Sequence, residues 1–274
     1  MRISPKILAA LLFLAFSAAS TFAQLAPPNL DGVTLGHIHL FVKDVPAQER
    51  FFTEMLGGTM VKNGPLTLIQ FPGVYIMLRK ADLSGPPAGS VVDHFGFVYK
   101  DLPAMMARWK QAGVRIEQAT NPNQGYVDAP DGIRVEFFGD PNLPVEVRMD
   151  HIHSFTTDVR GMQAWYAKVF GGVPGQRPRV STPGWVDCDF MPGEITLSFA
   201  PRDMKLAPTK GRSLDHIGFD VKDLDAFAKK LESLGISFDV APRQIPDSKT
   251  WVAFLTDPWG TYIEVTENLA PSPR

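Results

Sequence analysis

The stretch Gly36-His37-Ile38-His39 returns three more times, in altered form, along the 274-residue chain. The other copies are Asp93-His94-Phe95-Gly96, Asp150-His151-Ile152-His153 and Asp215-His216-Ile217-Gly218. Together they contain all six histidines, and each has an Asp seven residues after its first His: Asp44, Asp101, Asp158 and Asp223. Histidines scattered by chance would not keep this spacing four times. The chain is therefore an internal repeat centred on a residue type used for metal ligation or acid/base chemistry.

Each copy predicts a strand, a helix and about three short strands separated by Gly/Pro turns. The helices that we expect cover residues 45–56, 102–112, 161–170 and 224–234. Each has an apolar face or is followed by a glycine that can end it, and the first and third match at an offset of 114 residues. The aromatic residues at helical spacing are expected in the core: Phe51, Phe52, Trp165 and Tyr166.

The pattern predicts an α+β fold of four βαβββ modules, paired into two bowl-shaped half-barrel domains. We expect residues 34–140 to form the first domain from modules 1 and 2, and residues 149–267 the second from modules 3 and 4. The Pro-rich tract 140–144 would join them.

Residues 1–23 have a basic start, an apolar run and small residues ending at Ala23, which predicts a secretory signal peptide and a secreted or periplasmic protein. The run is too short for a membrane span, so no membrane association is expected after cleavage. The formal charge of −2 would become about −4 without Arg2 and Lys6, which gives no support for nucleic acid as a partner. The single Cys188 is expected to be a small buried hydrophobe.

Residues two apart on a strand share a face, so His37 and His39 point the same way, as do His151 and His153. The last strands of modules 2 and 4 each carry a Glu four residues after a turn glycine, Glu136 and Glu264. If each first strand faces its partner module across a bowl, two ligand sets result: His37 (or His39), His94 and Glu136, and His151 (or His153), His216 and Glu264. Two His and one carboxylate suit Fe(II), Zn or Mn.

The remaining histidine of each pair, His39 or His153, is a candidate acid/base residue. Arg134 and Tyr262 lie two residues before the Glu ligands and share their face, where they could orient an anionic oxygen or donate a proton. Gly96 and Gly218 are expected to leave room for a ligand. Three Asp residues that precede a His should point to the opposite face, towards a turn or solvent: Asp93, Asp150 and Asp215.

These motifs, together with the Gly-Gly after the first helix and the Pro-x-Gly-x-x-x-Glu endings, resemble the vicinal oxygen chelate superfamily. That superfamily includes glyoxalase I, bleomycin resistance proteins and extradiol dioxygenases. The resemblance covers nearly the whole chain after residue 23. It implies a divalent metal that binds two adjacent oxygens of a small-molecule substrate, with ligands at His37, His94 and Glu136 and at His151, His216 and Glu264.

The chain departs from two of these families. The fourth ligand of glyoxalase I falls on Met77 and on Thr196 or Leu197, unless Glu194 enters by a shifted register. The further His of extradiol dioxygenases is missing before Glu136 and Glu264, although Tyr126 matches the Tyr of that motif, which Phe254 replaces in the last module. A lyase or isomerase step, a ring-cleaving oxygenation and a sequestering protein without turnover all stay open. A monomer or homodimer is expected.

Overall fold

The computed structural model describes residues 25–175, 184–191 and 195–270. The expected signal peptide and Glu194 lie outside this part of the chain. Within the described residues, no helix has both the length and the apolar character needed to cross a membrane.

The four copies form four modules of the expected α+β kind, each a strand, a helix and three strands. The first contains β1 (Val33–Val42), α2 (Val45–Arg50) continued by the π-helix η1 (Phe51–Met55), β2 (Thr59–Asn63), β3 (Leu66–Phe71) and β4 (Val74–Lys80). The second contains β5 (Val92–Tyr99), α3 (Leu102–Gln111), β6 (Ile116–Gln118), β7 (Gln124–Asp128), the 3-10 turn η2 (Pro130–Gly132) and β8 (Arg134–Gly139).

The third contains β9 (Val147–Thr156), α4 (Val159–Phe170), β10 (Val173–Gly175), β11 (Val186–Met191) and β12 (Ile195–Pro201). The fourth contains β13 (Leu214–Val221), α5 (Leu224–Ser233), β14 (Val240–Gln244), β15 (Trp251–Thr256) and β16 (Tyr262–Glu267).

The Asp that recurs seven residues after each histidine starts the helix of its module. Its carboxylate accepts a hydrogen bond from a backbone N–H three residues later, at 2.8–3.0 Å, in all four copies: Asp44, Asp101, Asp158 and Asp223. An N-cap of this kind satisfies one of the backbone donors that a helix leaves unpaired at its start. In the repeated His–Asp spacing, the Asp therefore has a structural role as the helix cap, and the His is the residue with a possible chemical role.

The strands form two eight-stranded sheets, and each sheet takes one module from each half of the chain. One has the order β14-β15-β16-β13-β1-β4-β3-β2, from modules 4 and 1, and the other β10-β11-β12-β9-β5-β8-β7-β6, from modules 3 and 2. In both, the two central strands are antiparallel neighbours, β1 with β13 and β5 with β9. The expectation that residues 34–140 and 149–267 each form their own bowl is corrected by this topology.

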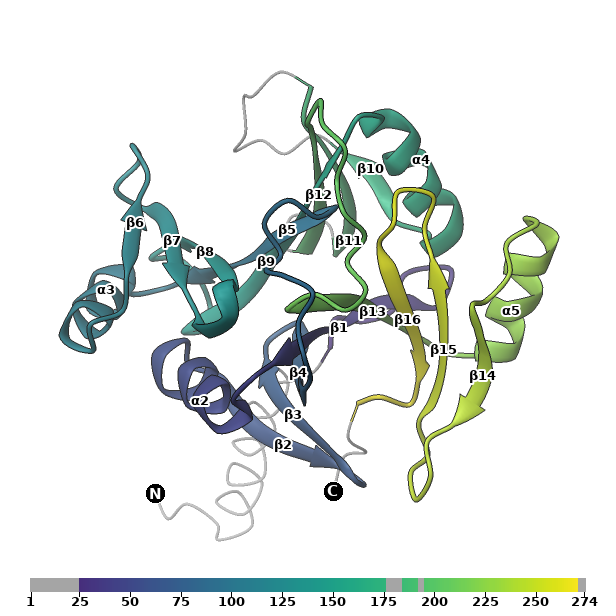
Figure 1. The fold of residues 1–274 in the computed structure, drawn as a ribbon, viewed down its shortest axis with the longest axis horizontal. Coiled ribbons are helices and arrows are strands. Elements are labelled where there is room, and N and C mark those ends of the chain that lie inside the picture. The colour runs from purple at the N-terminus through teal and green to yellow at the C-terminus, as the bar shows by residue number, and fades with distance from the viewer. Residues whose placement is uncertain (1–24, 176–183, 192–194, 271–274) are drawn as a thin grey trace, which may run out of the picture.

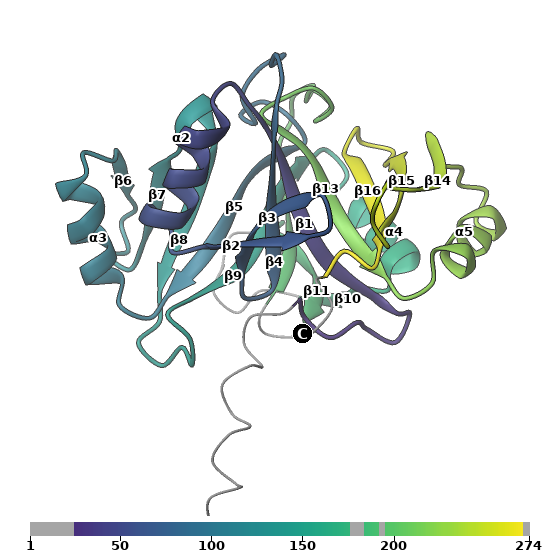
Figure 2. The ribbon, with the colours of Figure 1, turned by 90° about the horizontal axis from the view of Figure 1, so that it is seen from below.

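Consecutive modules instead meet through the apolar core between the sheets. Phe71 of β3 packs against Phe97 of β5 with ring centroids 4.4 Å apart, and Phe170 of α4 stacks on Phe219 of β13 at 3.9 Å. The first contact joins strands of the two sheets, and the second joins the helix of module 3 to a strand of module 4, so both connect consecutive modules. The expected core aromatics Phe52 and Tyr166 are buried here. Figures 1 and 2 place α2 and α3 at one end of the molecule and α4 and α5 at the other.

Candidate metal centres

Two groups of buried or half-buried side chains could each hold a metal ion. We call them the first cluster, which is His37, His39, His216 and Glu264, and the second cluster, which is His94, Glu136, His151 and His153. Within each, one potential ligand atom per residue lies within 4.8 Å of the others. All six metal ligands expected from the sequence belong to one of the two clusters, as do both candidate acid/base histidines.

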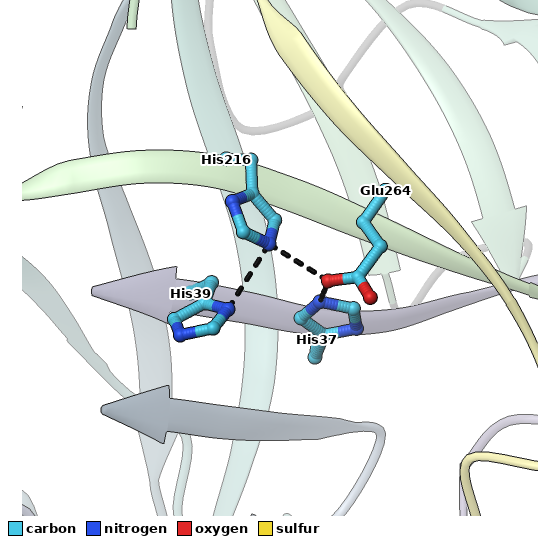
Figure 3. A group of neighbouring side chains, drawn as sticks. All are labelled: His37, His39, His216 and Glu264. Carbon is cyan, nitrogen blue, oxygen red and sulfur yellow. Dashed lines mark hydrogen bonds and ion pairs between the residues drawn. The ribbon is translucent and has the colours of Figure 1, made fainter. Parts of the chain in front are cut away.

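The first cluster lies where three strands meet (Figure 3). His37 and His39 project from β1, His216 from β13 and Glu264 from β16. Glu264 Oε2 is 3.0 Å from His37 Nε2 and 2.8 Å from His216 Nε2, and His216 Nε2 is also 3.1 Å from His39 Nδ1. Three ring nitrogens and one carboxylate oxygen therefore converge on one small region.

The second cluster repeats this arrangement in the other sheet. His151 and His153 come from β9, His94 from β5 and Glu136 from β8. Glu136 Oε2 lies 3.0 Å from both His94 Nε2 and His151 Nε2, but the His151 contact lacks hydrogen-bond geometry. The other oxygen, Glu136 Oε1, accepts a 2.7 Å hydrogen bond from the Gln124 side chain.

The partners of the two expected ligand sets are exchanged in the structure. His37 meets His216 and Glu264 rather than His94 and Glu136, which gather around His151. The physical reason is the pairing of the central strands: β1 hydrogen-bonds to β13, and β5 to β9. Modules 1 and 3 share one first-strand pattern, His-Ile-His, and modules 2 and 4 share another, His-x-Gly, so the local sequence does not indicate which even-numbered module pairs with module 1 and which with module 3.

The hydrogen bonds on the far side of the histidines make these clusters suitable for a cation. His216 Nδ1 lies 2.5 Å from Asp215 Oδ1, and His94 Nδ1 lies 2.8 Å from Asp93 Oδ1. A carboxylate accepts hydrogen bonds, so a neutral imidazole here places its proton on Nδ1 and leaves a lone pair on Nε2. That lone pair faces a Glu oxygen, and a metal ion between them would satisfy both. The donor set suits Zn, Fe(II) or Mn.

Without a metal, protons on the histidines compensate for the negative charge of the Glu residues. Burial by itself would lower the pKa of His216, but the hydrogen bonds to Asp215 and Glu264 raise it above the ordinary value. Burial would likewise raise the pKa of Glu264, but the charge of His37 and the hydrogen bond from His216 lower it. His94 and Glu136 show the same opposite shifts. Since a metal must displace the protons held here, its binding would release them.

The glycines of the even-numbered modules make room for a histidine ring, not directly for a ligand as expected. Gly218 lies opposite His37 in the β1–β13 register, and Gly96 lies opposite His151 in the β5–β9 register. A Cβ on Gly218 would lie 2.0 Å from His37 Cε1, and one on Gly96 would lie 2.5 Å from His151 Cε1. Any side chain at either position would push a ligand out of its cluster.

The Asp residues that precede three histidines do not point away from them, which corrects the expectation of a turn or solvent role. Asp150 Oδ2 lies 2.8 Å from His151 Nδ1, so this pair matches those of Asp93 and Asp215. Each Asp is the extra residue of a one-residue β-bulge: for example, Leu214 and His216 pair with successive residues of β1. A bulge breaks strict alternation and re-aims a side chain. Sequence reasoning missed these residues because it assumed regular strands.

His39 belongs to the first cluster and also lines a cavity of about 420 Å³. The cavity lies where β3 and β4 are no longer paired, since their register ends at Ile69 with Ile76, and it is lined by Leu66 on one side and Met77 and Arg79 on the other. Burial and the neighbouring His216 lower the pKa of His39 well below its ordinary value. His39 is therefore a neutral imidazole in contact with both the cluster and the cavity.

The other two candidate catalytic residues lie beside the clusters rather than in them. The Tyr262 ring is 5.7 Å from that of His216 and carries Lys210 Nζ 4.2 Å above it. The Arg134 guanidinium lies 3.9 Å above the Tyr126 ring, and its Nη2 pairs with Glu117 at 2.8 Å. Arg134 therefore contacts Tyr126, whose ring is in turn 5.3 Å from that of His94.

The positions expected for a fourth ligand carry no carboxylate. Met77 is paired with His39 and Thr196 with His151, so both share the face of the histidines, whereas Leu197 is paired with Ile152.

In the second cluster, His153 packs against Trp185 with ring centroids 4.6 Å apart. Cys188 is buried as expected, and burial together with Asp189 and Asp187 raises its pKa to about 12.

Comparison with known proteins agrees with this geometry. The family model of the Glyoxalase/Bleomycin resistance protein/Dioxygenase superfamily matches residues 34–137 and again residues 148–265. The chain belongs to this superfamily. Each match covers one half of the chain, modules 1 and 2 or modules 3 and 4. In the structure, each half contributes strands to both sheets. No curated protein matched the chain.

Solved structures share the superfamily fold. Glyoxalase I from Zea mays is 16% identical with a TM-score of 0.66, covering 86% of this chain and 92% of its own. A candidate dioxygenase from Bacillus subtilis is 12% identical with a TM-score of 0.62, covering 87% of this chain and 86% of its own. The cppA protein from Streptococcus pneumoniae is 8% identical with a TM-score of 0.51, covering 89% and 100%. At these identities the likeness concerns the fold alone.

Proposed function

We propose that this protein is an exported, metal-dependent enzyme of the vicinal-oxygen-chelate type that acts on a small oxygenated metabolite. The observation that carries the proposal is the first cluster, where His37, His216 and Glu264 converge while His39 borders a cavity. Two His and one carboxylate leave coordination positions open for a substrate. A bound Zn, Fe(II) or Mn ion would act as a Lewis acid towards two neighbouring substrate oxygens.

The protein's own residues supply the remaining functions. His39, neutral because of burial and His216, is placed to accept a proton from a molecule in the cavity. Asp215 fixes the ring of His216 through Nδ1 and so directs Nε2 towards the centre of the cluster. Tyr262 covers the edge of the His216 ring, and in the second cluster Arg134 holds Tyr126 against His94.

The cavity indicates the kind of molecule that this site would take. Its walls are apolar at Met60, Leu66 and Met77, and two charged side chains also line it, Arg79 and Glu49. We therefore expect a small substrate with an apolar body and an oxygen that accepts a hydrogen bond from Arg79. A volume of about 420 Å³ lies within the range of ligand pockets, which is roughly 300–1,000 Å³.

A second candidate is a small-molecule binding or sequestering protein of the bleomycin-resistance type, which would capture its ligand without turnover. Met77 favours it, because this thioether side chain, paired with His39, stands where glyoxalase I has its fourth metal ligand. The same replacement disfavours a glyoxalase-type proton transfer through that position. A lyase or isomerase step based on His39 and a ring-cleaving oxygenation are the two enzymatic outcomes.

Export is part of the proposal and rests on the basic, apolar and small-residue order of residues 1–23. Secretion or periplasmic delivery would leave the metal to be acquired outside the cytoplasm. Cell fractionation, with the mature N-terminus determined by sequencing, tests this. A chain that starts after Ala23 in the exported fraction is expected, and an uncut chain retained in the cytoplasm would contradict it.

Elemental analysis and turnover together test the enzymatic proposal. Protein isolated from the exported fraction is expected to contain Fe, Zn or Mn, and the variant His216→Ala combined with His94→Ala should contain none. Oxygen uptake with catechols would identify a dioxygenase, and isomerised or eliminated product without oxygen uptake a lyase or isomerase. Stoichiometric capture without product would support the sequestering protein instead. Unchanged metal content in the double variant would refute both sites.

A further inference from the structure

The two clusters differ in how their histidines are held. All four first strands have a one-residue bulge directly before the ligand histidine, at Gly36, Asp93, Asp150 and Asp215. In three strands the bulge residue is an Asp bonded to the Nδ1 of that histidine, at 2.8, 2.8 and 2.5 Å. In β1 the bulge residue is Gly36, which has no side chain to offer.

His37 is consequently the exception. Its ring is fully buried, and among the described residues its Nδ1 has no hydrogen-bond partner. Its orientation depends on the contact of Nε2 with Glu264 and on the space left by Gly218. The first cluster thus has one ligand histidine with an Asp partner, His216, and one without.

The second cluster has an Asp partner on both of its ligand histidines, and these carboxylates are buried or nearly so: the side chains of Asp93 and Asp150 are 16% and 4% exposed. Arg202 lies 3.7 Å from the other oxygen of Asp93, a long contact with a one-third exposed side chain. Such a contact weakens the Asp93 charge only slightly. Both ligand histidines of this cluster therefore have a carboxylate at Nδ1 that fixes their tautomer and ring orientation.

A carboxylate behind a metal-bound histidine has a known effect on affinity. It fixes the tautomer and the ring orientation and raises the basicity of the ligand nitrogen, and its removal typically weakens metal binding by about 10–100-fold. The two clusters otherwise present the same donors, two ligand histidines, one Glu and one further histidine. The difference of one carboxylate should therefore appear directly in their affinities.

We propose that the two metal sites are unequal: the second cluster binds a divalent metal about 10–100-fold more tightly than the first. The second cluster then fills first and keeps its metal, while the first, next to the cavity, holds an exchangeable ion. This inference rests on the proposed metal binding and adds the order in which the sites fill. It assigns Asp93 and Asp150 as positioning residues of the tight site.

Zn²⁺ titration of the metal-free mature protein against a chromophoric chelator tests this. His94→Ala leaves only the first cluster intact, and His216→Ala leaves only the second. The Kd for Zn²⁺ should be about 10–100-fold higher in His94→Ala than in His216→Ala. Adding Asp93→Asn to His216→Ala should weaken the second cluster to near the level of the first. His151→Ala isolates the first cluster independently if His94→Ala fails to fold, and the unmodified protein should titrate in two steps.

Equal affinities, or a tighter first cluster, would overturn the inference while leaving the proposed enzyme intact. Absence of Zn²⁺ binding in both single variants and in the unmodified protein would instead refute the metal-dependent function itself, and the inference with it. An Asp93→Asn change without effect on the Kd of the second cluster would also count against the inference, because it would separate affinity from the Asp–His pairs.

Discussion

Gly218→Ala tests the architecture of the first cluster with a single methyl group. The added Cβ would lie 2.0 Å from His37 Cε1 and 2.2 Å from His37 Nδ1, whereas ordinary contacts begin at 3.4 Å. The His37 ring must therefore retreat by about 1.4 Å, well beyond the roughly 0.2 Å tolerance of a metal–ligand distance. The interior is close-packed, so overpacking should also destabilise the fold by about 1–3 kcal/mol.

The assay is the Zn²⁺ stoichiometry of the purified variant at micromolar free metal, with thermal unfolding measured in parallel. We expect the first cluster to lose its Zn²⁺ and the second to keep it. Gly96→Ala should do the reverse, because its Cβ would lie 2.5 Å from His151 Cε1. Gly113→Ala is the matched control for a loss of stability away from the clusters. Its added Cβ would have no atom within 4 Å, but the φ of +71° makes alanine cost about 1–2 kcal/mol there. Full Zn²⁺ binding to the first cluster of Gly218→Ala would refute the reasoning.

Three further predictions concern the rest of the molecule. Burial raises the pKa of Asp220 from 3.8 to about 6 despite its hydrogen bond from Thr266, so the protonated form is favoured in the fold and stability falls as pH rises from about 4 to 6. Asp220→Asn should therefore be more stable than the unmodified protein at pH 8, by about 1–3 kcal/mol in urea unfolding of the metal-free chain, and a less stable variant would contradict this. Asp101→Ala removes the N-cap of α3 and should cost about 1 kcal/mol in thermal unfolding, against no loss for a change at exposed Lys110. Cys188 should resist alkylation in the native protein at pH 8 and react fully in denaturant, and fast native labelling would show that it is not buried.

The sequence patterns that correctly predicted structure act over a few neighbouring residues. The helix expected at 102–112 is α3, and that at 224–234 is α5, because an N-cap Asp and a glycine just past the end act within a few residues. The expected helix at 45–56 exists as α2 followed by a π-helical turn at Phe51–Met55. The ligand histidines and both Glu residues were also predictable, since the repeat marks each of them with the same neighbours.

What the sequence missed depends on departures from regular geometry. Alternation placed Asp93, Asp150 and Asp215 on the far face, but a bulge at each position turns the carboxylate back to the next histidine. A usable signal was present: three of the four ligand histidines follow an Asp, and the fourth follows Gly36. This difference between Asp and Gly predicts which histidines have a carboxylate partner only when the bulge is known.

The sequence by itself determined the four modules, the helix caps, the superfamily and the identity of the residues that gather in the clusters. Only the tertiary structure decided which of them meet: His37 with His216 and Glu264, and His151 with His94 and Glu136. The physical reason is that each module offers the same strand edge to any partner. In the fold, the two modules of each half pack through core contacts such as Phe71 with Phe97 and Phe170 with Phe219, while the central strands pair with a partner from the opposite half, β1 with β13 and β5 with β9.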